Sequence, residues 1–268
     1  MNFKALIASG LIALSSIVSA QTCHIVSPYA PGGPADDFVK AMQSSTPEID
    51  IVQHRPGAFA SRGIDFMREN PDYIMAAAPL MWTSKNPDKN PPVELLDVVL
   101  LYGQTGVTGK GVTFNDILTK DVTIAIPNLG GSQHLIALEL KAANPKIVIV
   151  PIAGAAAGLQ LVVNKEVDVY ITPAKTGKQM VQDFPNVSMV FEIPKNKRSI
   201  KIQNVTLSNY GMFALFVHSS ATPLQKEAAR DCVKKITAST ALDEALAKVE
   251  AAPFRRPAAV KAEYVEKA

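Results

Sequence analysis

Residues 28–42 read PYAPGGPADDFVKAM, and they follow the short apolar segment CHIVS of residues 23–27. Prolines and paired glycines of this kind make a tight turn between a strand and a helix. They also leave the start of the helix open, so that its first backbone N–H groups can point at an anion. The stretch therefore predicts a strand, a glycine turn and a helix, with two interpretations of the turn: connection only, or ligand binding.

The same alternation continues along the chain. A strand ending in a turn is expected at 49–59, a helix at 60–70 and a strand at 73–79. A loop rich in Pro, Lys and Asn (83–94), a strand (97–103) and a flexible crossing, GQTGVTGKG (103–111), come next. A second series follows, with helices expected at 114–120, 130–144 and 154–165, strands at 122–127, 146–152, 167–173 and 188–193, a basic loop at 194–201, an apolar run at 212–218 and Ala-, Lys- and Glu-rich helices over 223–248. This order predicts an α/β protein with mostly parallel sheets covered on both faces.

The first 20 residues have the three parts of a secretory signal peptide. MNFK is basic, ALIASGLIALSSIV is apolar, and Val18-Ser19-Ala20 is a small-residue cleavage site. We expect an exported, mature protein that begins at Gln21. The apolar run is too short and interrupted for a membrane span, and no later segment offers about 18 uncharged apolar residues. Thr22 before Cys23 argues against lipidation.

Charge does not indicate a partner. The formal net charge is +3, and it falls to +2 when Lys4 leaves with the signal peptide. The lysines of KNPDKNPP and PKNKRSIK are interleaved with Pro and Asn, as in solvated loops. Such weak, scattered charge excludes an argument for binding to nucleic acid or to a membrane surface.

The chain has two cysteines, Cys23 and Cys232, which both remain after cleavage. In an oxidising compartment they could form a disulfide between the first strand and a late helix. Two independent buried thiols are the alternative, because a sequence does not show the Cα separation.

Three patterns in the sequence resemble a phosphate loop, a nucleophile elbow and a zinc site, but each lacks residues or spacings that the site needs. GQTGVTGKG lacks the spacing and the hydroxyl residue of a phosphate loop, because Gln104 and Gly111 stand at the deciding positions. GGSQH has His134 where a nucleophile elbow ends in glycine, and Ser132 is more simply a helix N-cap. The histidines and cysteines lack the paired spacings of a zinc site. We expect no metal, no cofactor and no enzymatic activity.

What recurs is a glycine turn after a strand. PGGPAD follows the first strand, LGGSQH follows VTIAIPN, and AGAAAG follows KIVIVPI. Open α/β sheets bind ligands in the loops at the carboxyl ends of their strands. Open helix starts in both halves of the chain therefore predict an anion site between them.

The order of these turns resembles a known family. PYAPGGPAD, HRPGAFASRG with ENPDYIM, PNLGGSQHLIALEL, VPIAGAAAGLQLVVNKEVDVYIT and YGMFALFVHSSATP are similar to successive landmarks of the substrate-binding proteins of tripartite tricarboxylate transporters, the Bug family. The resemblance extends from about Ile25 to Pro223. It implies a periplasmic receptor without enzymatic activity, which captures a small organic anion and delivers it to an integral-membrane permease.

The implied fold is the type II periplasmic-binding-protein fold: two lobes, each with a mostly parallel sheet flanked by helices, and a cleft between them. Residues 1–20 would be the signal peptide, 21–105 the first part of lobe 1, 106–212 lobe 2, and 213–268 the return to lobe 1. Crossings between the lobes would lie near 104–111 and 209–215. Nucleic acid is not expected as a partner, and the protein is expected to be a monomer.

The resemblance also implies a ligand site. Asp36 would fix the first glycine loop rather than touch the ligand. Matched residue by residue, the ligand contacts would be Tyr29, Ala30, Gly32, Gly33 and Ala35 in lobe 1 and Gly130, Gly131, Ser132, His134, Ala153 and Gly154 in lobe 2.

Several positions depart from the family pattern. The family often has a hydroxyl residue at Ala35, Tyr-Lys-Gly at 152–154, Asn at His54, Asp-Gly-Tyr at 71–73 and a glycine-rich turn at 164–165. The missing hydroxyl and lysine favour a smaller or less charged ligand than citrate, with Ser132 and His134 as the remaining side-chain donors. The tail after Val249 is also shorter than usual.

Two other functions stay open. One is a periplasmic sensory or scaffold protein with the same fold and no transport role. The other is a secreted hydrolase that uses Ser132 and His134, although side chains two residues apart at a helix start point in divergent directions.

Overall fold

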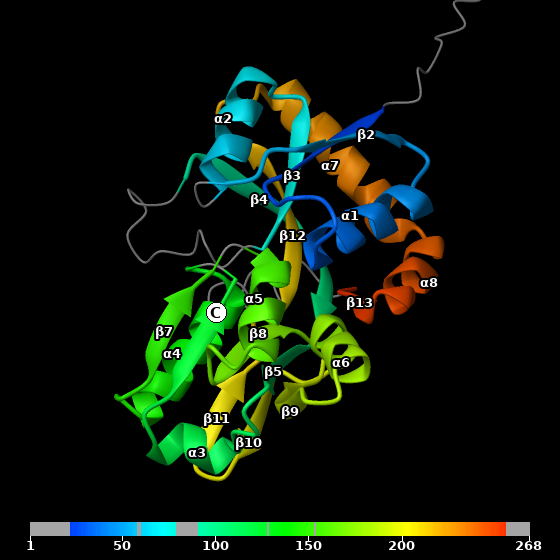
Figure 1. Ribbon diagram of the computed structural model, residues 1–268. Coiled ribbons are helices and arrows are strands. Elements are labelled where there is room, and N and C mark those ends of the chain that lie inside the picture. The colour runs from blue at the N-terminus through cyan, green and yellow to red at the C-terminus, as the bar shows by residue number, and fades with distance from the viewer. Residues whose placement is uncertain (1–21, 58–59, 79–90, 128, 153, 256–268) are drawn as a thin grey trace, which may run out of the picture.

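The computed structural model describes residues 22–57, 60–78, 91–127, 129–152 and 154–255, which form two lobes stacked end to end (Figure 1). We call the six-stranded sheet and its helices lobe 1, and the five-stranded sheet and its helices lobe 2. The helices of lobe 1 are α1 (Pro34–Ser45), α2 (Ser61–Glu69), α7 (Pro223–Ala238) and α8 (Ala241–Lys248). Those of lobe 2 are α3 (Phe114–Thr119), α4 (Ser132–Ala143), α5 (Gly154–Val163) and α6 (Ala174–Asp183).

The sheet of lobe 1 has the order β13-β4-β12-β3-β1-β2. Its strands are β1 (Cys23–Ser27), β2 (Ile49–His54), β3 (Tyr73–Ala77), β4 (Val93–Tyr102), β12 (Met212–His218) and β13 (Ala251–Pro253). Only β1, β2 and β3 pair in parallel, while β12 is antiparallel to both β3 and β4, and β13 is antiparallel to β4. The sheet is therefore mixed, a correction to the expected mostly parallel arrangement.

The sheet of lobe 2 has the order β7-β6-β8-β5-β9. Its strands are β5 (Gln104–Thr108), β6 (Thr123–Ile126), β7 (Val148–Pro151), β8 (Val169–Pro173) and β9 (Ser188–Ile193). Here too part of the sheet is parallel: β6 pairs in parallel with the edge strand β7 and with β8, whereas β5 is antiparallel to both of its neighbours. The α/β class is confirmed, and both sheets are mixed because the chain crosses between the lobes in antiparallel strands.

The crossing GQTGVTGKG is not a flexible segment. Its residues 104–108 form β5, which is buried along its whole length between β8 and β9. Gly106 lies where a Cβ would meet the Phe191 ring at 2.4 Å, and Gly109 lies where a Cβ would meet the Val162 carbonyl oxygen at 2.0 Å. Gly106 permits close packing within β5 and Gly109 permits it directly after the strand, whereas the sequence suggested a flexible crossing.

Two further segments differ from expectation. The basic loop at 194–201 ends in β10 (Ser199–Ile202), which forms a hairpin with β11 (Val205–Ser208). The C-terminal tail continues through β13, which pairs with β4 and completes the edge of lobe 1. The remainder of the tail and the signal peptide lie outside the described residues.

Lobe 1 buries apolar side chains on both faces of its sheet. Ile25 of β1 packs into a cluster with residues of α1, α7 and α8, whereas the next residue, Val26, packs on the other face with Ile64 and Met67 of α2. Successive side chains of a strand point to opposite faces. A strand covered by helices on both faces is therefore apolar on both sides at its centre, as Ile25 and Val26 of β1 are.

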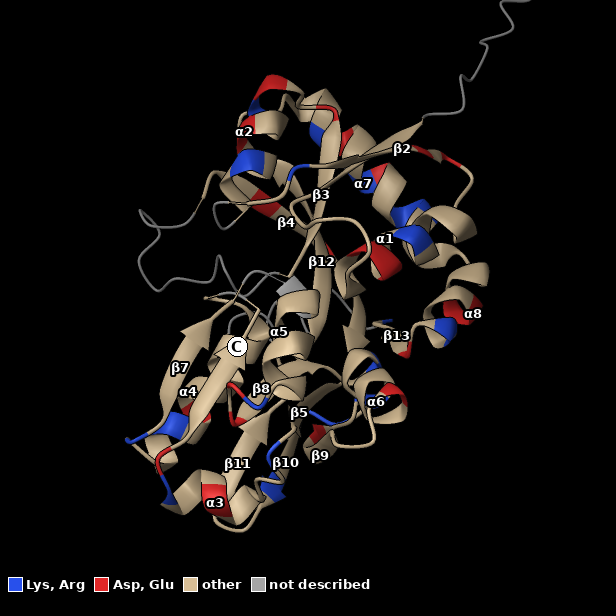
Figure 2. Ribbon diagram, viewed as in Figure 1, with Lys and Arg blue, Asp and Glu red and all other residues tan. Residues whose placement is uncertain are grey.

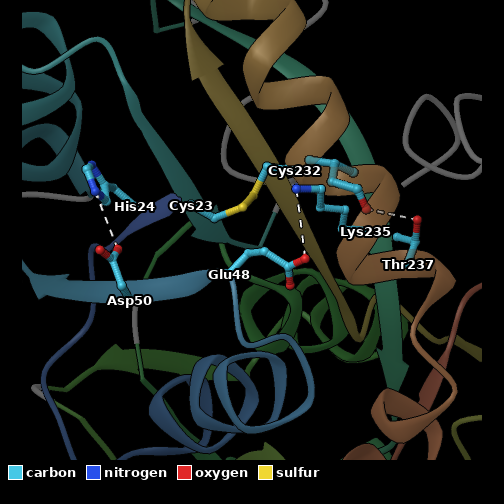
Figure 3. Close-up of a disulfide and its surroundings, with 8 residues drawn as sticks. Cys23, His24, Glu48, Asp50, Cys232, Lys235 and Thr237 are labelled. Carbon is cyan, nitrogen blue, oxygen red and sulfur yellow. Dashed lines mark hydrogen bonds and ion pairs between the residues drawn. A yellow bond between two sulfur atoms is a disulfide. The ribbon is translucent and has the colours of Figure 1, made fainter. Parts of the chain in front are cut away.

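Of the two alternatives for the cysteines, the structure has the disulfide. Cys23 of β1 and Cys232 of α7 are joined with a Cα–Cα distance of 5.9 Å, and the bond spans 209 residues of sequence (Figure 3). Ion pairs flank it, between Lys235 and Glu48 at 3.8 Å and between His24 and Asp50 at 3.4 Å. The disulfide ties the two ends of the chain together within lobe 1.

Positive and negative side chains are interspersed over both lobes (Figure 2). In the part of the chain that the structure describes, no helix has the length and apolarity to cross a bilayer.

Candidate functional site

The turn between β1 and α1 is held by a side chain of its own helix. Gly32 has a φ of 82°, and its N–H donates to Oδ2 of Asp36 at 2.8 Å. Gly33 is the N-cap of α1 and Pro34 is its first residue. Positive φ is a conformation that glycine adopts without strain. The turn thus has a fixed shape, set by Gly32 and Asp36.

Asp36 is the centre of this turn. Its side chain is 1% exposed, and it forms ion pairs with Lys40 at 2.7 Å and His54 at 3.4 Å. Burial alone would raise the pKa of this carboxyl, but hydrogen bonds from Lys40 and Gly32 outweigh that effect and hold it below its usual value. His54 also donates from Nδ1 to the carbonyl oxygen of Tyr29 at 3.0 Å. These contacts support the structural role predicted for Asp36.

The turn between β6 and α4 repeats this design in lobe 2. Gly130 has a φ of 74°, and its N–H donates to Nδ1 of His134 at 3.0 Å. Gly131 is the N-cap of α4. In each lobe, a left-handed glycine is followed by an N-cap glycine, and the glycine N–H is bound by the side chain four residues further on. We call these segments, 32–36 and 130–134, the twin glycine turns.

The twin turns differ in charge. Asp36 is an anion, whereas His134 accepts a hydrogen bond at Nδ1, so a neutral imidazole carries its hydrogen on Nε2. Burial lowers the pKa of His134, which favours this neutral form. The first turn of α1 contains Asp36 and Asp37, while that of α4 contains no acidic residue. The lobe-2 turn is therefore the better place for the negative group of a ligand.

Ser132 is placed differently from expectation. It is the first residue of α4 and not its N-cap, and its side chain makes no capping bond, so that assignment is wrong. Its hydroxyl is buried and donates to Oε1 of Gln133 at 3.1 Å, while it accepts from Nε2 of Gln104 at 2.9 Å. Since the hydroxyl hydrogen points to Gln133, the arrangement gives no support to Ser132 as a nucleophile activated by His134.

The remaining predicted contacts belong to the region of the lobe-1 turn and to the start of α5 in lobe 2. The Tyr29 hydroxyl accepts from the N–H of Ala78 at 3.2 Å, and its ring lies 6.2 Å from that of Phe213. Ala30 is exposed and Ala35 packs against the lobe-1 core. In lobe 2, Gly154 begins α5, and Ala153 lies outside the described residues.

The first turns of three helices converge where the lobes meet. Lys175 of α6 pairs with Asp37 of α1 at 2.8 Å. Tyr102 of lobe 1 contacts the Ser132 hydroxyl of α4 at 3.3 Å, and its ring lies 4.9 Å from that of Phe38 on α1. The glycine motifs in the sequence indicate the starts of α1 and α4 as site elements, whereas no motif marks α6 or Tyr102. The paired glycines mark both turns in the sequence, but the side chains that bind the glycine N–H groups, Asp36 and His134, share no residue type that would have indicated this role.

The described residues contain no group of three or more His, Cys, Asp or Glu placed to hold a metal ion.

Comparison with known proteins gives matches in structure alone. No protein-family model matches the chain, and no curated protein matches it. Among solved structures, the periplasmic binding protein BugD has a TM-score of 0.68 at 17% identity, covering 92% of this chain and 94% of its own. MatC (Rpa3494) from Rhodopseudomonas palustris, solved with bound malate, has a TM-score of 0.68 at 15% identity, covering 92% and 97%. R. palustris Rpa4515, solved with adipate, has a TM-score of 0.70 at 13% identity, covering 92% and 93%.

These neighbours agree with the resemblance seen in the glycine turns, and they extend over more than nine-tenths of the chain. At such low identity they establish the fold. The chain has the two-lobe fold of the periplasmic binding protein BugD and of the other solved neighbours.

Proposed function

We propose that this protein is a periplasmic solute receptor of the Bug family, which holds a small organic carboxylate between the twin glycine turns. The observation that carries the proposal is the paired geometry of these turns, one in each lobe, at helix starts that meet between the lobes. Structural neighbours solved with malate and adipate support the ligand class.

Ligand recognition would rest on the backbone and on one imidazole. The N–H groups of Gly32 and Gly130 are occupied by Asp36 and His134. The N–H groups that follow them in each turn, with the Nε2–H of His134, are the donors proposed for a carboxylate. Charge-assisted hydrogen bonds of this kind, in a site from which water is excluded, are sufficient for micromolar affinity, about −8 kcal/mol.

Binding would lead to transport because the ligand changes the relative populations of the open and closed arrangements of the lobes. A ligand that contacts both lobes favours the closed arrangement, and the closed receptor would dock on an integral-membrane permease. The N-terminal signal sequence supports export to the periplasm, with cleavage after Ala20. The receptor needs no cofactor, acts as a monomer and is not an enzyme.

A thermal-shift screen tests this proposal. The protein is unfolded and refolded to remove co-purified ligand and then heated with mono-, di- and tricarboxylates and their amides. A ligand at 100 times its dissociation constant adds about 2.7 kcal/mol, or roughly 5 to 10 °C at this size. A shift confined to one carboxylate class supports the receptor. No shift with any of them would contradict it and favour the sensory or scaffold alternative.

A further inference from the structure

The place where the chain passes from lobe 1 to lobe 2 contains a buried group of polar side chains. Tyr102 is the last residue of β4, Gln104 is the first residue of β5, and Gly103 alone separates them. The second crossing lies against the first, because the N–H of Tyr102 donates to the carbonyl of Gly211 at 2.8 Å. A Cβ at Gly103 would lie 2.9 Å from the carbonyl oxygen of Ile193, so the crossing is closely packed.

Three lobe-2 side chains here form a closed ring of hydrogen bonds. Ser132 donates to Oε1 of Gln133, Gln133 donates from Nε2 to Oε1 of Gln104 at 2.9 Å, and Gln104 donates from Nε2 to Ser132. All three side chains are at most 6% exposed. A ring in which each member donates to the next fixes the orientation of every amide and hydroxyl in it.

This ring determines the direction of the bond to Tyr102. The Ser132 hydroxyl has one hydrogen and two acceptor sites, and the ring uses the hydrogen and one acceptor site. At 3.3 Å, Tyr102 must therefore donate its hydroxyl hydrogen to the remaining site of Ser132. Ser132 has then no donor left for a ligand.

Tyr102 connects this ring to α1, the helix that begins at the glycine turn of lobe 1. Its ring lies 4.9 Å from the Phe38 ring in α1, and Phe38 lies 5.5 Å from Phe213 of β12. Phe38 of α1 and the first residue of α4 are thus joined through Tyr102 by one aromatic contact and one hydrogen bond. A single hydroxyl hydrogen links the two helices that begin at the twin glycine turns.

We propose that the hydrogen bond from Tyr102 to Ser132 positions α4 against lobe 1 and stabilises the arrangement of the lobes in which both glycine turns face the ligand. Tyr102 and Ser132 are then positioning residues, and Ser132 acts between the lobes instead of contacting the solute. This proposal depends on the proposed function in one respect: it takes lobe closure as the step that the hydrogen bond controls. Its test uses the protein without ligand.

The test measures the distance between the lobes. Spin labels are attached at Glu69→Cys on α2 and Asn115→Cys on α3, both exposed positions, while the native cysteines stay in their disulfide. Double electron–electron resonance then gives the populations of short and long distances. Because Tyr102→Phe removes the hydroxyl and its interactions with the ring while it keeps the aromatic contact, we expect the ratio of short to long distances to fall about 5-fold, a change equivalent to about 1 kcal/mol.

Matched variants separate this role from simple destabilisation. Tyr170→Phe removes another buried tyrosine hydroxyl, inside lobe 2, and is expected to leave the distances unchanged. Tyr102→Phe should have no further effect in a Ser132→Ala background, because the acceptor is already absent. The proposal is overturned if Tyr102→Phe folds with wild-type distance populations, or if Tyr170→Phe shifts them equally. A receptor that binds no carboxylate could still show the Tyr102 effect, so the two proposals fail independently.

Discussion

At the residue scale, the twin glycine turns show what a sequence reveals and what it hides. The glycines at 32–33 and 130–131 mark both turns, and an anion site could be predicted from them. The pairing of each left-handed glycine with the side chain four residues on could not, because one partner is Asp36 and the other is His134. Aspartate and histidine share no chemical class, yet each presents an acceptor to an N–H group.

Adjacent glycines offer an internal comparison of backbone strain. Gly32 has a φ of 82° with no atom within 4 Å of an added Cβ, while Gly33 has a φ of −98° and would place a Cβ in ordinary contact with the Ala30 carbonyl oxygen at 3.9 Å. Gly32→Ala should lower the free energy of unfolding by about 1–2 kcal/mol through strain alone. Gly33→Ala introduces no such strain and should cost less, about 0.5 kcal/mol, because alanine is a poorer N-cap than glycine. Equal effects of both substitutions in urea-induced unfolding would contradict the assigned turn geometry.

Acidification should weaken the fold through two histidines. Burial lowers the pKa of His134 and of His218, and each accepts a backbone N–H at Nδ1, from Gly130 and Ser220. Below the ordinary pKa of about 6.5, the unfolded chain binds more protons than the folded one, so stability falls as the pH decreases through this window. Unfolding measured between pH 8 and pH 5 should show this slope. His134→Gln and His218→Gln should each reduce it, and an unchanged slope in both variants would refute the assignment.

At the scale of elements, most helices and strands follow from the periodicity of the sequence. The main wrong prediction is the flexible crossing at residues 103–111, which contains β5. GQTGVTGKG has the composition of a loop, but its glycines accommodate Phe191 and the Val162 carbonyl against β5. Composition does not distinguish a glycine that makes a loop flexible from one whose missing side chain lets a neighbouring group pack closely. The mixed pairing of the sheets could not be predicted either. The strand β12 pairs antiparallel with β4 although more than 100 residues separate them in the chain.

The packing role of glycine can be tested on α6. Gly177 lies where a Cβ would be 2.2 Å from Cγ2 of Thr105 on β5. Alanine normally stabilises a helix relative to glycine by about 1 kcal/mol, so the sign of the effect is informative. We expect Gly177→Ala to destabilise the protein by about 1–3 kcal/mol. The penalty should shrink in a Thr105→Ser background, which lacks Cγ2, and a stabilising Gly177→Ala would show that α6 does not approach β5 as described.

At the scale of the whole molecule, the two lobes were expected from the resemblance, while their connections required coordinates. The first crossing is at Gly103, between β4 and β5, and the second lies between β11 and β12. Sequence spacing could not choose between a disulfide and two thiols, because the bond depends on β1 and α7 packing within lobe 1. The ion pair of Lys175 with Asp37 likewise depends on how the lobes meet.

The disulfide should contribute strongly to stability, because it closes a loop of 209 residues in the unfolded chain. Replacing both Cys23 and Cys232 with alanine is expected to lower the free energy of unfolding by about 2–5 kcal/mol. Chemical denaturation of the variant and the oxidised wild type measures this difference. Identical unfolding curves would mean that the bond does not form in the folded protein.

The central claim is that a carboxylate is held by the backbone of both glycine turns. The most direct measurement is the NMR shift of the backbone amides of Gly33 and Gly131 during titration of the refolded protein with malate, adipate and the other carboxylates of the screen. We predict that the amides of both turns move together and saturate at one affinity. A carboxylate that binds and leaves either turn unmoved, or a complete series that moves neither, would contradict the account.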